Sequence, residues 1–355
     1  MKIAHVVDSL EVGGVETLVA QICWLQRELG HEPIVFVIGS LGPLGKRMLR
    51  DGFDVRTPCA GRLPGAVWKF YRLFNQTRPD VVHLHNPTPT SYASAAAKAA
   101  HVRCVVSTRH SLAGKPRRRV TELKYAFSVR FCDRIVGICD ATVSNLRDAH
   151  PSQAGKMVRV YNGIVPMART PREQWPAKEG FTLLYVGRLA PVKNLAFLIE
   201  AFGGALQANE NLRLWIVGDG GERQTLEALA SASGVASRIT FWGEQLDPAP
   251  YFSAADAFIM SSTSEGLPIS LLQAFSIGLP VIVTDVGGMA EAARLIDAGL
   301  IVSKNDPTGM SDAILRFAKE VQVREFYGKN ALAGFEAHFT LKAAVAEYEE
   351  LYSCS

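Results

Sequence analysis

Hydrophobic residues along the chain form short runs that alternate with longer stretches whose apolar positions recur every three or four residues. The short runs predict buried β-strands, and the longer stretches predict amphipathic helices. Strands separated by helices of this length pair in parallel through right-handed crossovers, so the first half is predicted to be a doubly wound α/β sheet. Its predicted strands are Lys2–Val7, Ile34–Ile38, Val81–His85, Arg103–Thr108, Arg134–Ile138 and Met157–Tyr161. Its predicted helices are a first one with Val15, Leu18, Val19, Ile22, Leu25 and Leu29 on one face, then Val67–Thr77, Thr90–Ala100, Arg117–Phe131 and Ala141–Ala149.

The same alternation starts again after residues 166–180, a polar segment with three prolines that is predicted to be a linker. The predicted strands of the second half are Phe181–Val186, Leu212–Val217, Arg238–Trp242, Ala257–Met260, Val281–Thr284 and Leu300–Val302. Its predicted helices are Asn194–Gln207, Gly221–Ser233, Ile269–Ile277, Met289–Ile296 and Thr308–Asn330, and a last helix, Leu341–Tyr352, is expected to cross back to the first domain. The predicted domains are residues 1–165 with 340–355, and residues 181–339. Two such Rossmann-like domains are expected to face a cleft at the carboxyl ends of their strands.

Charge is distributed unevenly between the two predicted domains. Residues 1–165 carry 23 Lys and Arg against 12 Asp and Glu, a net charge of +11, whereas the rest of the chain carries −7. A basic domain indicates an anionic partner such as a phosphate ligand or a membrane surface. The six cysteines form no Cys-x-x-Cys pair, and neither a secretory signal nor a membrane-spanning run is visible, which favours a cytoplasmic protein with reduced thiols.

Candidate chemistry lies in the loops that follow predicted strands. Gly13 and Gly14 follow the first strand, where paired glycines let a ligand approach the backbone; an ordinary tight turn explains them about equally well. Gly187, Arg188 and Lys193 follow the strand Phe181–Val186, and the two cations can converge on a diphosphate, although solvated surface charge is the alternative. No Gly-x-Gly-x-x-Gly is present, so a dinucleotide dehydrogenase is not supported.

A third loop presents an acid at the start of a helix. Glu265 precedes Gly266, Leu267 and Pro268, and the free amides at a helix start suit a phosphate or a sugar hydroxyl. Gln273 lies farther along that helix. The alternative is that Glu265 only caps the helix and that Gln273 is a surface residue.

The order of these motifs resembles a known family. A Gly-Gly loop, then Gly-Arg-Leu-x-x-x-Lys-Asn, then Glu-Gly-Leu-Pro and finally Gly-Leu-Pro-Val-Ile-Val-Thr-Asp-Val-Gly-Gly is similar to the retaining glycosyltransferases with two Rossmann-like domains, the GT-B fold. Within them it is most similar to glycosyltransferase family four, which includes bacterial polysaccharide and lipid glycosyltransferases. The resemblance covers essentially the whole chain.

The resemblance implies roles for individual residues. Gly14, beside Gly13, would lie against the donor phosphate, and Arg188 and Lys193 after Gly187 would hold the diphosphate and stabilise the departing nucleotide. Glu265 would bind hydroxyls of the transferred sugar, supported by the amides of Gly266 and Leu267 at the helix that Pro268 opens. Phe241, Trp242 and Gly243 would face the base, and His110 matches the active-site histidine of the family.

Gln273 departs from the pattern, because the family usually has a second Glu eight positions after the first to bind the ribose. A glutamine keeps one acceptor oxygen but loses the charge, so donor affinity is expected to be lower. The chain contains no Asp-x-Asp, the pair with which glycosyltransferases of another fold hold a metal. We therefore expect Arg188, Lys193 and helix amides to neutralise the diphosphate without a metal or other cofactor.

The sequence gives weaker signals for the residues that would bind the acceptor. Asn86 follows the strand Val81–His85, and Lys115, Arg117, Arg118 and Arg119 form a basic run before an amphipathic helix. This run could hold an acceptor pyrophosphate or dock on anionic lipid at the inner face of the plasma membrane, and a solvated cationic surface explains it equally well. No motif supports nucleic-acid binding.

The sequence thus predicts transfer of a hexosyl unit from a nucleotide diphosphate sugar to a hydroxyl acceptor with retention, in bacterial surface polysaccharide or glycolipid synthesis. A UDP-sugar is favoured as donor, with GDP-mannose second. Two alternatives stay open: a non-catalytic nucleotide-sugar-binding homologue, which Gln273 suggests, and a nucleotide-sugar epimerase of the same fold. An epimerase typically needs several carboxylates around the sugar, and only Glu265 is placed there.

Overall fold

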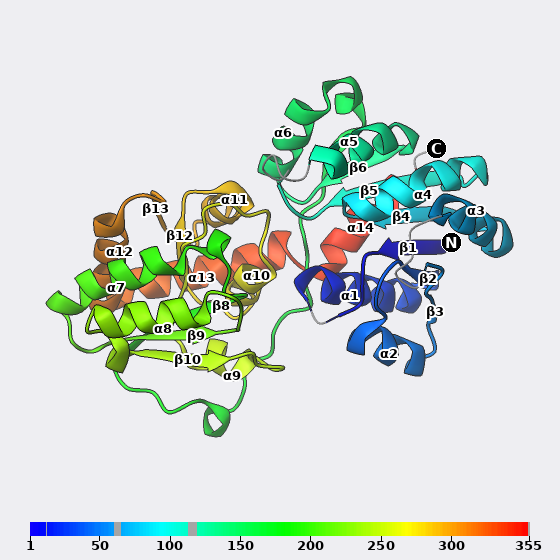
Figure 1. The fold of residues 1–355 in the computed structure, drawn as a ribbon. Helices are drawn as coiled ribbons and strands as arrows, with labels where there is room; N and C mark the ends of the chain where they lie inside the picture. Colours follow the sequence, from blue (N-terminus) through cyan, green and yellow to red (C-terminus); the bar gives the residue numbers. More distant parts are fainter. Residues whose placement is uncertain (12, 60–64, 113–118, 354–355) are drawn as a thin grey trace. The chain divides into compact units, whose positions relative to one another are not determined.

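A computed structural model describes residues 1–11, 13–59, 65–112 and 119–353, and divides the chain into two compact units. The first unit holds Met1–Ile164 and Leu341–Ser355, and the second holds Val165–Thr340. Each unit is a parallel sheet between helices, so the described part of the chain has the predicted pair of Rossmann-like folds (Figure 1).

The first sheet has the strand order β3-β2-β1-β4-β5-β6-β7. Helices α3 and α4 bury Phe70, Phe74 and Ala93 on one face, and α1 and α2 bury Cys23 and Met48 on the other. The strands are β1 (Lys2–Val7), β2 (Glu32–Val37), β3 (Asp54–Arg56), β4 (Val81–His85), β5 (Cys104–Arg109), β6 (Arg134–Gly137) and β7 (Met157–Arg159). The helices are α1 (Gly14–Glu28), α2 (Gly42–Arg50), α3 (Ala66–Thr77), α4 (Pro87–Ala99), α5 (Arg119–Ser128), α6 (Asp140–Ala149) and α14 (Leu341–Ser353), with 3-10 turns η2 (Val129–Phe131) and η3 (Pro151–Lys156).

The second sheet has the order β10-β9-β8-β11-β12-β13, and a core centred on Leu183, Phe202 and Leu214 joins β8, α7 and β9. Its strands are β8 (Phe181–Val186), β9 (Leu212–Val217), β10 (Ile239–Gly243), β11 (Ala257–Met260), β12 (Val281–Thr284) and β13 (Gly299–Val302). Its helices are α7 (Leu195–Ala208), α8 (Arg223–Ala232), α9 (Ala249–Ala254), α10 (Ile269–Ser276), α11 (Gly287–Leu295), α12 (Pro307–Lys319) and α13 (Val321–His338), with 3-10 turns η4 (Arg172–Gln174), η5 (Pro191–Lys193) and η6 (Ala236–Arg238).

Several expectations about elements need correction. The pattern did not predict α2, which contains two glycines and a proline, nor β3 and α9, which are too short to show a periodicity. The single helix predicted over Thr308–Asn330 is two helices, because Glu320 leaves the helical region at φ −102° and ψ 86°. The helix predicted from Arg117 is described from Arg119 and tightens into η2 after Ser128.

The segment predicted to be a linker belongs to the second unit. The amide of Met167 donates to Ser276 Oγ at 3.1 Å, and the amide of Thr170 donates to Ser253 Oγ at 3.0 Å. Lys178 pairs with Asp256 at 2.8 Å. These bonds attach residues 167–178 to the second unit, although this segment forms no strand.

The last helix belongs to the first unit. Helix α14, drawn in red, lies beside α1 and β5 (Figure 1). Its buried tyrosines bond strand residues, with Tyr352 Oη 2.7 Å from His83 Nδ1 and Tyr348 Oη 3.3 Å from Thr108 Oγ1. The start of α14 is fixed by the Leu341 amide, which donates to the Ile164 carbonyl at 2.9 Å.

Candidate functional site

The predicted donor loops lie at the point where the second sheet reverses its strand order. The order runs outward from β8 to β9 and β10 on one side and from β11 to β12 and β13 on the other. Loops that leave neighbouring strands in opposite directions create a crevice at their carboxyl ends, the usual ligand site of such sheets. Arg188 and Lys193 follow β8, and Glu265 follows β11, so both loops start at this point.

Close backbone contact shapes the loop after β8. The Gly187 amide donates to the Val217 carbonyl at 3.0 Å, and the Leu189 amide donates to the Asp219 carbonyl at 2.9 Å. A Cβ atom on Gly218 would overlap the Gly187 carbonyl, and Gly218 has φ +129°, so a glycine is required there. This packing holds the backbone in place while the Arg188 side chain is exposed.

Lys193 and Glu265 form an ion pair at the centre of this site. Lys193 Nζ is 2.5 Å from Glu265 Oε1, and their side chains are only 16% and 15% exposed. Ser262 Oγ donates to the same carboxylate oxygen at 2.9 Å, and Ser261 Oγ donates to the Lys193 carbonyl at 2.9 Å. The structure therefore brings together the two residues predicted to bind phosphate and sugar, and their contacts with a ligand stay predictions.

The start of α10 completes this arrangement. Gly266 and Leu267 are buried, and Pro268 precedes the helix with extended backbone and no side-chain cap. The first amides of such a helix are available to an anion or a hydroxyl. Gln273 is half-buried on α10, and its carbonyl accepts from Ser276 Oγ at 2.8 Å.

The segment predicted to face the base ends β10. The ring of Trp242 lies edge-on to Trp215 and Tyr251, with centroids 5.9 and 5.1 Å away. Gly243 accepts from the Gly218 amide at 2.7 Å, which ties this segment to the loop after β8. Phe241 packs against the core. Trp242 and Phe241 therefore support the segment from inside, and contact with a base stays a prediction.

The reversal point of the first sheet lies between β1 and β4. Asp8 follows β1, and the loop with Gly13 and Gly14 leads into α1. The Glu16 carboxylate occupies the space beside Gly13 that a Cβ would fill. The glycine loop predicted to meet a phosphate therefore has an acid at its helix start, and its phosphate contact stays a prediction.

Asp8 was not predicted as a site residue. Burial raises its pKa from 3.8 to about 6; a hydrogen bond with Thr88 lowers it, and the neighbouring Glu16 raises it further. Its position directly after a buried strand was the available signal. A carboxyl group that titrates near neutral pH can keep a proton, or its ionised form can accept one from a hydroxyl group.

Asn86 and His110 are brought together at the ends of β4 and β5. Asn86 has φ +75°, its amide donates to the Thr108 carbonyl at 2.8 Å, and its Oδ1 accepts from the His110 amide at 3.2 Å. Asn86 therefore positions the backbone of His110. Its predicted contact with an acceptor stays a prediction.

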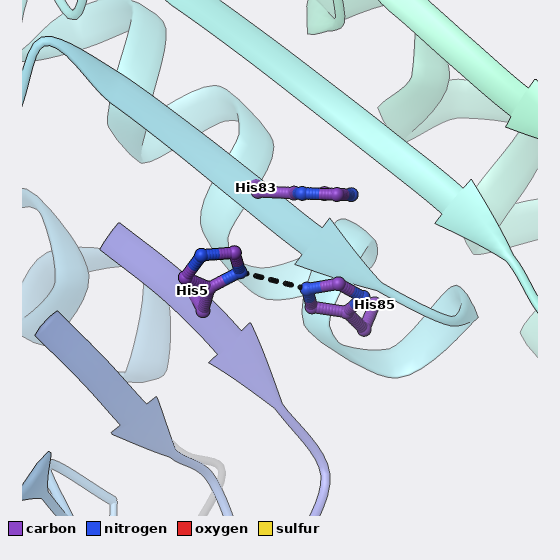
Figure 2. A group of neighbouring side chains, drawn as sticks. All are labelled: His5, His83 and His85. Carbon is purple, nitrogen blue, oxygen red and sulfur yellow. Dashed lines mark hydrogen bonds between the residues drawn. The ribbon is translucent and has the colours of Figure 1, made fainter. Parts of the chain in front are cut away.

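His110 also belongs to a cluster of buried histidines that sequence reasoning missed. His5 on β1 and His83 and His85 on β4 lie together, as Figure 2 shows. His85 Nδ1 is 3.2 Å from His110 Nε2. The available signal was the His-x-His spacing in a buried strand, which places both rings on one face of the sheet.

The predicted basic run is described only in part. Lys115, Arg117 and Arg118 lie outside the described residues, and Arg119 is the first residue of α5. The following helix exposes a row of large apolar side chains, Val120, Leu123 and Phe127, at 67%, 71% and 59%. An ion pair at 2.8 Å between the buried Arg109 and the half-buried Glu122 attaches this helix to β5.

Comparisons with known proteins agree with this architecture. Residues 12–166 match the family model for Glycosyltransferase Family 4, and residues 180–320 match the model for Glycosyl transferases group 1. The lipopolysaccharide core biosynthesis glycosyltransferase LpsD of Rhizobium meliloti is 31% identical over 187 residues, 53% of each chain. The phosphatidyl-myo-inositol mannosyltransferase of Mycolicibacterium smegmatis is 27% identical over 89% of this chain and 83% of its own.

Solved structures show the same fold. Anabaena Alr3699/HepE in complex with UDP superposes with a TM-score of 0.88 over all of both chains, at 20% identity. The two family models cover both halves, so the chain belongs to the GT-B glycosyltransferases, and within them it is a family-four-like member. For three curated relatives, LpsD among them, the match spans 23% to 53% of the relative's own length. None of the described helices is long and apolar enough to cross a membrane.

Proposed function

We propose that this protein transfers a hexosyl unit from a nucleotide diphosphate sugar to a hydroxyl acceptor, with retention. The observation that carries the proposal is the placement of Arg188, Lys193 and Glu265 at the reversal point of the second sheet. Two cations and the start of α10 supply positive charge, and Glu265 supplies an acceptor for sugar hydroxyls.

The roles of the two cations in the proposed transfer follow from where negative charge develops during the reaction. As the glycosidic bond breaks, negative charge grows on the departing diphosphate, and Arg188 and Lys193 stabilise it more in the transition state than in the ground state. We place no metal or other cofactor in this step, because these two side chains and the amides at α10 provide the neutralising charge. The leaving phosphate takes the proton of the acceptor hydroxyl, which attacks from the same face of the sugar.

A UDP-sugar is the proposed donor, with GDP-mannose as the second candidate. The Anabaena relative in fold was solved in complex with UDP and with UDP and glucose, which supports a uridine nucleotide. We propose a role in bacterial surface polysaccharide or glycolipid synthesis, in line with the names of LpsD and the inositol mannosyltransferase.

The proposed acceptor is linked to a lipid, and the protein acts in the cytoplasm at the membrane surface. The row Val120, Leu123 and Phe127 is exposed on α5, and Lys124 and Arg130 are exposed beside it. Apolar side chains rimmed by cations suit the boundary of an anionic bilayer. This helix would hold the first unit at the lipid surface while the acceptor is used.

A thermal-shift and turnover screen with UDP-glucose, GDP-mannose and ADP-glucose tests the proposal. We expect a UDP-sugar to raise the melting temperature and to release UDP when an acceptor is present. Arg188→Ala is expected to reduce both effects. Lys178→Ala serves as a control, because Lys178 pairs with Asp256 at the opposite end of β11.

Each other result rejects the proposal in a distinct way. Binding without consumption of any donor would favour a non-catalytic binding protein. Conversion of the bound sugar into an epimer without an acceptor would favour an epimerase. If no nucleotide sugar shifted the melting temperature, the donor site itself would be assigned wrongly.

A further inference from the structure

Arg109, the last residue of β5, directly precedes His110 and places its side chain on the face of the sheet opposite the histidine cluster. Ser107 of this strand bonds α4 at 2.8 Å, whereas Thr108 bonds α14 at 3.3 Å. Side chains alternate along a strand, so Arg109 points to the same side as Ser107 and meets α5 there. His110 belongs to the other side, where its Nε2 is 3.2 Å from His85 Nδ1.

Three nitrogens of the Arg109 guanidinium form hydrogen bonds. Nη1 and Nη2 donate to the two carboxylate oxygens of Glu122 on α5, at 2.9 and 2.8 Å. Nε donates to the carbonyl of Ser111 at 3.1 Å. The side chain therefore bends back over its own backbone and joins α5 to the turn formed by residues 109–111.

Glu122 holds the guanidinium in this place. Arg109 is only 3% exposed, and an arginine keeps its charge at any ordinary pH. A buried cation needs a paired anion with good hydrogen bonds, which Glu122 provides through both of its oxygens. The Tyr125 ring covers the group, with its centroid 5.1 Å from the guanidinium carbon. Without the Glu122 charge, we expect Arg109 to turn towards water and to release the Ser111 carbonyl.

The backbone of His110 is held on both sides. Its amide donates to Asn86 Oδ1 at 3.2 Å, and the carbonyl of the next residue, Ser111, accepts from Arg109. Asn86 is itself fixed, since its amide donates to the Thr108 carbonyl at 2.8 Å. The direction of the imidazole depends on the backbone angles of this turn, and these bonds restrain them.

We propose that Arg109 and Glu122 are positioning residues for His110, and that Glu122 acts on the imidazole through Arg109 and the Ser111 carbonyl. The consequence for turnover rests on the proposed function, together with the predicted place of His110 beside the transferred sugar. The orientation of His110 is a property of the first unit and can be measured without a substrate. The alternative is that the ion pair only attaches α5 to β5.

Histidine ring signals provide the first test. The full-length protein is labelled with ¹³C in its eight histidine rings, and His110→Gln assigns the His110 signals. Glu122→Gln keeps the shape of the side chain but removes its charge. We expect the His110 signals to shift or to broaden in this variant. Unchanged His110 signals would overturn the proposal.

Asp133→Asn is the matched control. Asp133 pairs with Lys98 of α4 at 2.7 Å and accepts from the Val105 amide at 2.8 Å, so this variant also removes a half-buried carboxylate charge from the first unit. Val105 lies near the start of β5, whereas His110 follows its end. We expect a comparable drop in Tm and unchanged His110 signals.

Arg109→Lys separates the turn from the attachment of α5. A lysine keeps a positive charge for Glu122, but its single nitrogen cannot replace the planar fork that also reaches the Ser111 carbonyl. We expect the His110 signals to change as in Glu122→Gln, while Tm falls less. Unchanged His110 signals in Arg109→Lys would show that the ion pair only attaches α5, and would overturn the proposal.

Release of UDP from UDP-glucose, with the acceptor of the turnover screen, tests the link to the reaction. We expect Glu122→Gln to lower kcat by roughly tenfold or more and to change the donor KM by less than about twofold, because it displaces one group without touching the donor loops. Asp133→Asn should keep its kcat.

The possible failures of this test are distinguishable. Equal losses of kcat in Glu122→Gln and Asp133→Asn would show a purely structural effect and would overturn the link to turnover. An unchanged kcat in Glu122→Gln despite altered His110 signals would overturn it as well. If the unmodified protein released no UDP from any donor, the proposed function would be contradicted, and the ring signals would still decide whether the pair positions His110.

Discussion

At the scale of single residues, Arg188 and Lys193 differ in how they are held. Arg188 is exposed, whereas Lys193 is bound to Glu265 and nearly buried. Each change to alanine should lower kcat about a hundredfold, about 3 kcal/mol of transition-state stabilisation, with a smaller effect on KM. Steady-state kinetics with the donor varied measures both constants. A raised KM with unchanged kcat would show that the cations do not act on the leaving group.

Lys193→Ala also leaves the Glu265 carboxylate without its cationic partner, with only the Ser262 hydroxyl still donating to it, and this lowers stability. Arg188→Ala therefore tests the leaving-group role more directly. The double variant Lys193→Ala/Glu265→Gln removes both charges of the pair, so its melting temperature shows how much of the stability loss in Lys193→Ala comes from the unpaired carboxylate.

Gln273 is the residue at which this chain departs from its family. If it faces the ribose, Gln273→Glu should tighten UDP binding by about 1 kcal/mol, because a carboxylate accepts both hydroxyl protons and makes stronger bonds. Repulsion from the diphosphate and from Glu265 reduces the gain. Calorimetry with UDP measures it, and equal or weaker binding would show that another group contacts the ribose.

Asp8 provides a prediction about pH. Its folded pKa of about 6 lies above the ordinary 3.8, so the protonated form is favoured by folding. The associated stability is fully present below pH 4 and is lost as the pH rises through 6. Asp8→Asn stays neutral and should raise the free energy of unfolding by about 1 kcal/mol at pH 8, and by much less at pH 4. Urea unfolding at both pH values measures this, and equal changes would contradict the assignment.

At the scale of elements, α5 combines a buried attachment with an exposed apolar row. The ion pair between Arg109 and Glu122 attaches the helix, so changes at its outer side should leave the fold intact. Leu123→Ser and Phe127→Ser should each weaken binding to vesicles of anionic phospholipid by about 1–2 kcal/mol, from the lost burial of apolar surface.

Vesicle co-sedimentation measures this loss. Leu246→Ser is the matched control, because Leu246 is 93% exposed on the second unit. Equal binding by all four proteins would mean that α5 is not the contact with lipid.

At the scale of the whole molecule, the chain returns to its first unit only after the second is complete. Val345 on α14 is buried in the first unit, and Phe335 on α13 is buried in the second. Val345→Ala should therefore cost about 2 kcal/mol and increase amide exchange in β4 and β5. Phe335→Leu should increase exchange in the second unit instead. Hydrogen exchange read by mass spectrometry distinguishes the two patterns. Faster exchange in the second unit of Val345→Ala, or in the first unit of Phe335→Leu, would contradict the division of the chain into these two units.

The sequence by itself determined the two α/β sheets and the loops that carry the candidate chemistry. Strands β1, β4, β8, β9, β11 and β12 have their predicted bounds, because fully buried parallel strands read as continuous apolar runs. The sequence could not indicate α2, because its glycines and proline interrupt the helical spacing of apolar residues. It also could not indicate the break at Glu320, because the apolar spacing does not show where the backbone leaves the helical region.

Only the tertiary structure decided which side chains meet. Lys193 and Glu265 are 72 residues apart in sequence, and His5 and His85 are 80 apart, yet each pair forms a hydrogen bond. Such pairs depend on strand order, because the placement of β8 beside β11 and of β1 beside β4 brings their loops and side chains together. Strand order is a property of the assembled sheet, and local hydrophobic patterns do not contain it. For the same reason the contact of Glu122 on α5 with Arg109, beside His110, became visible only in the folded first unit.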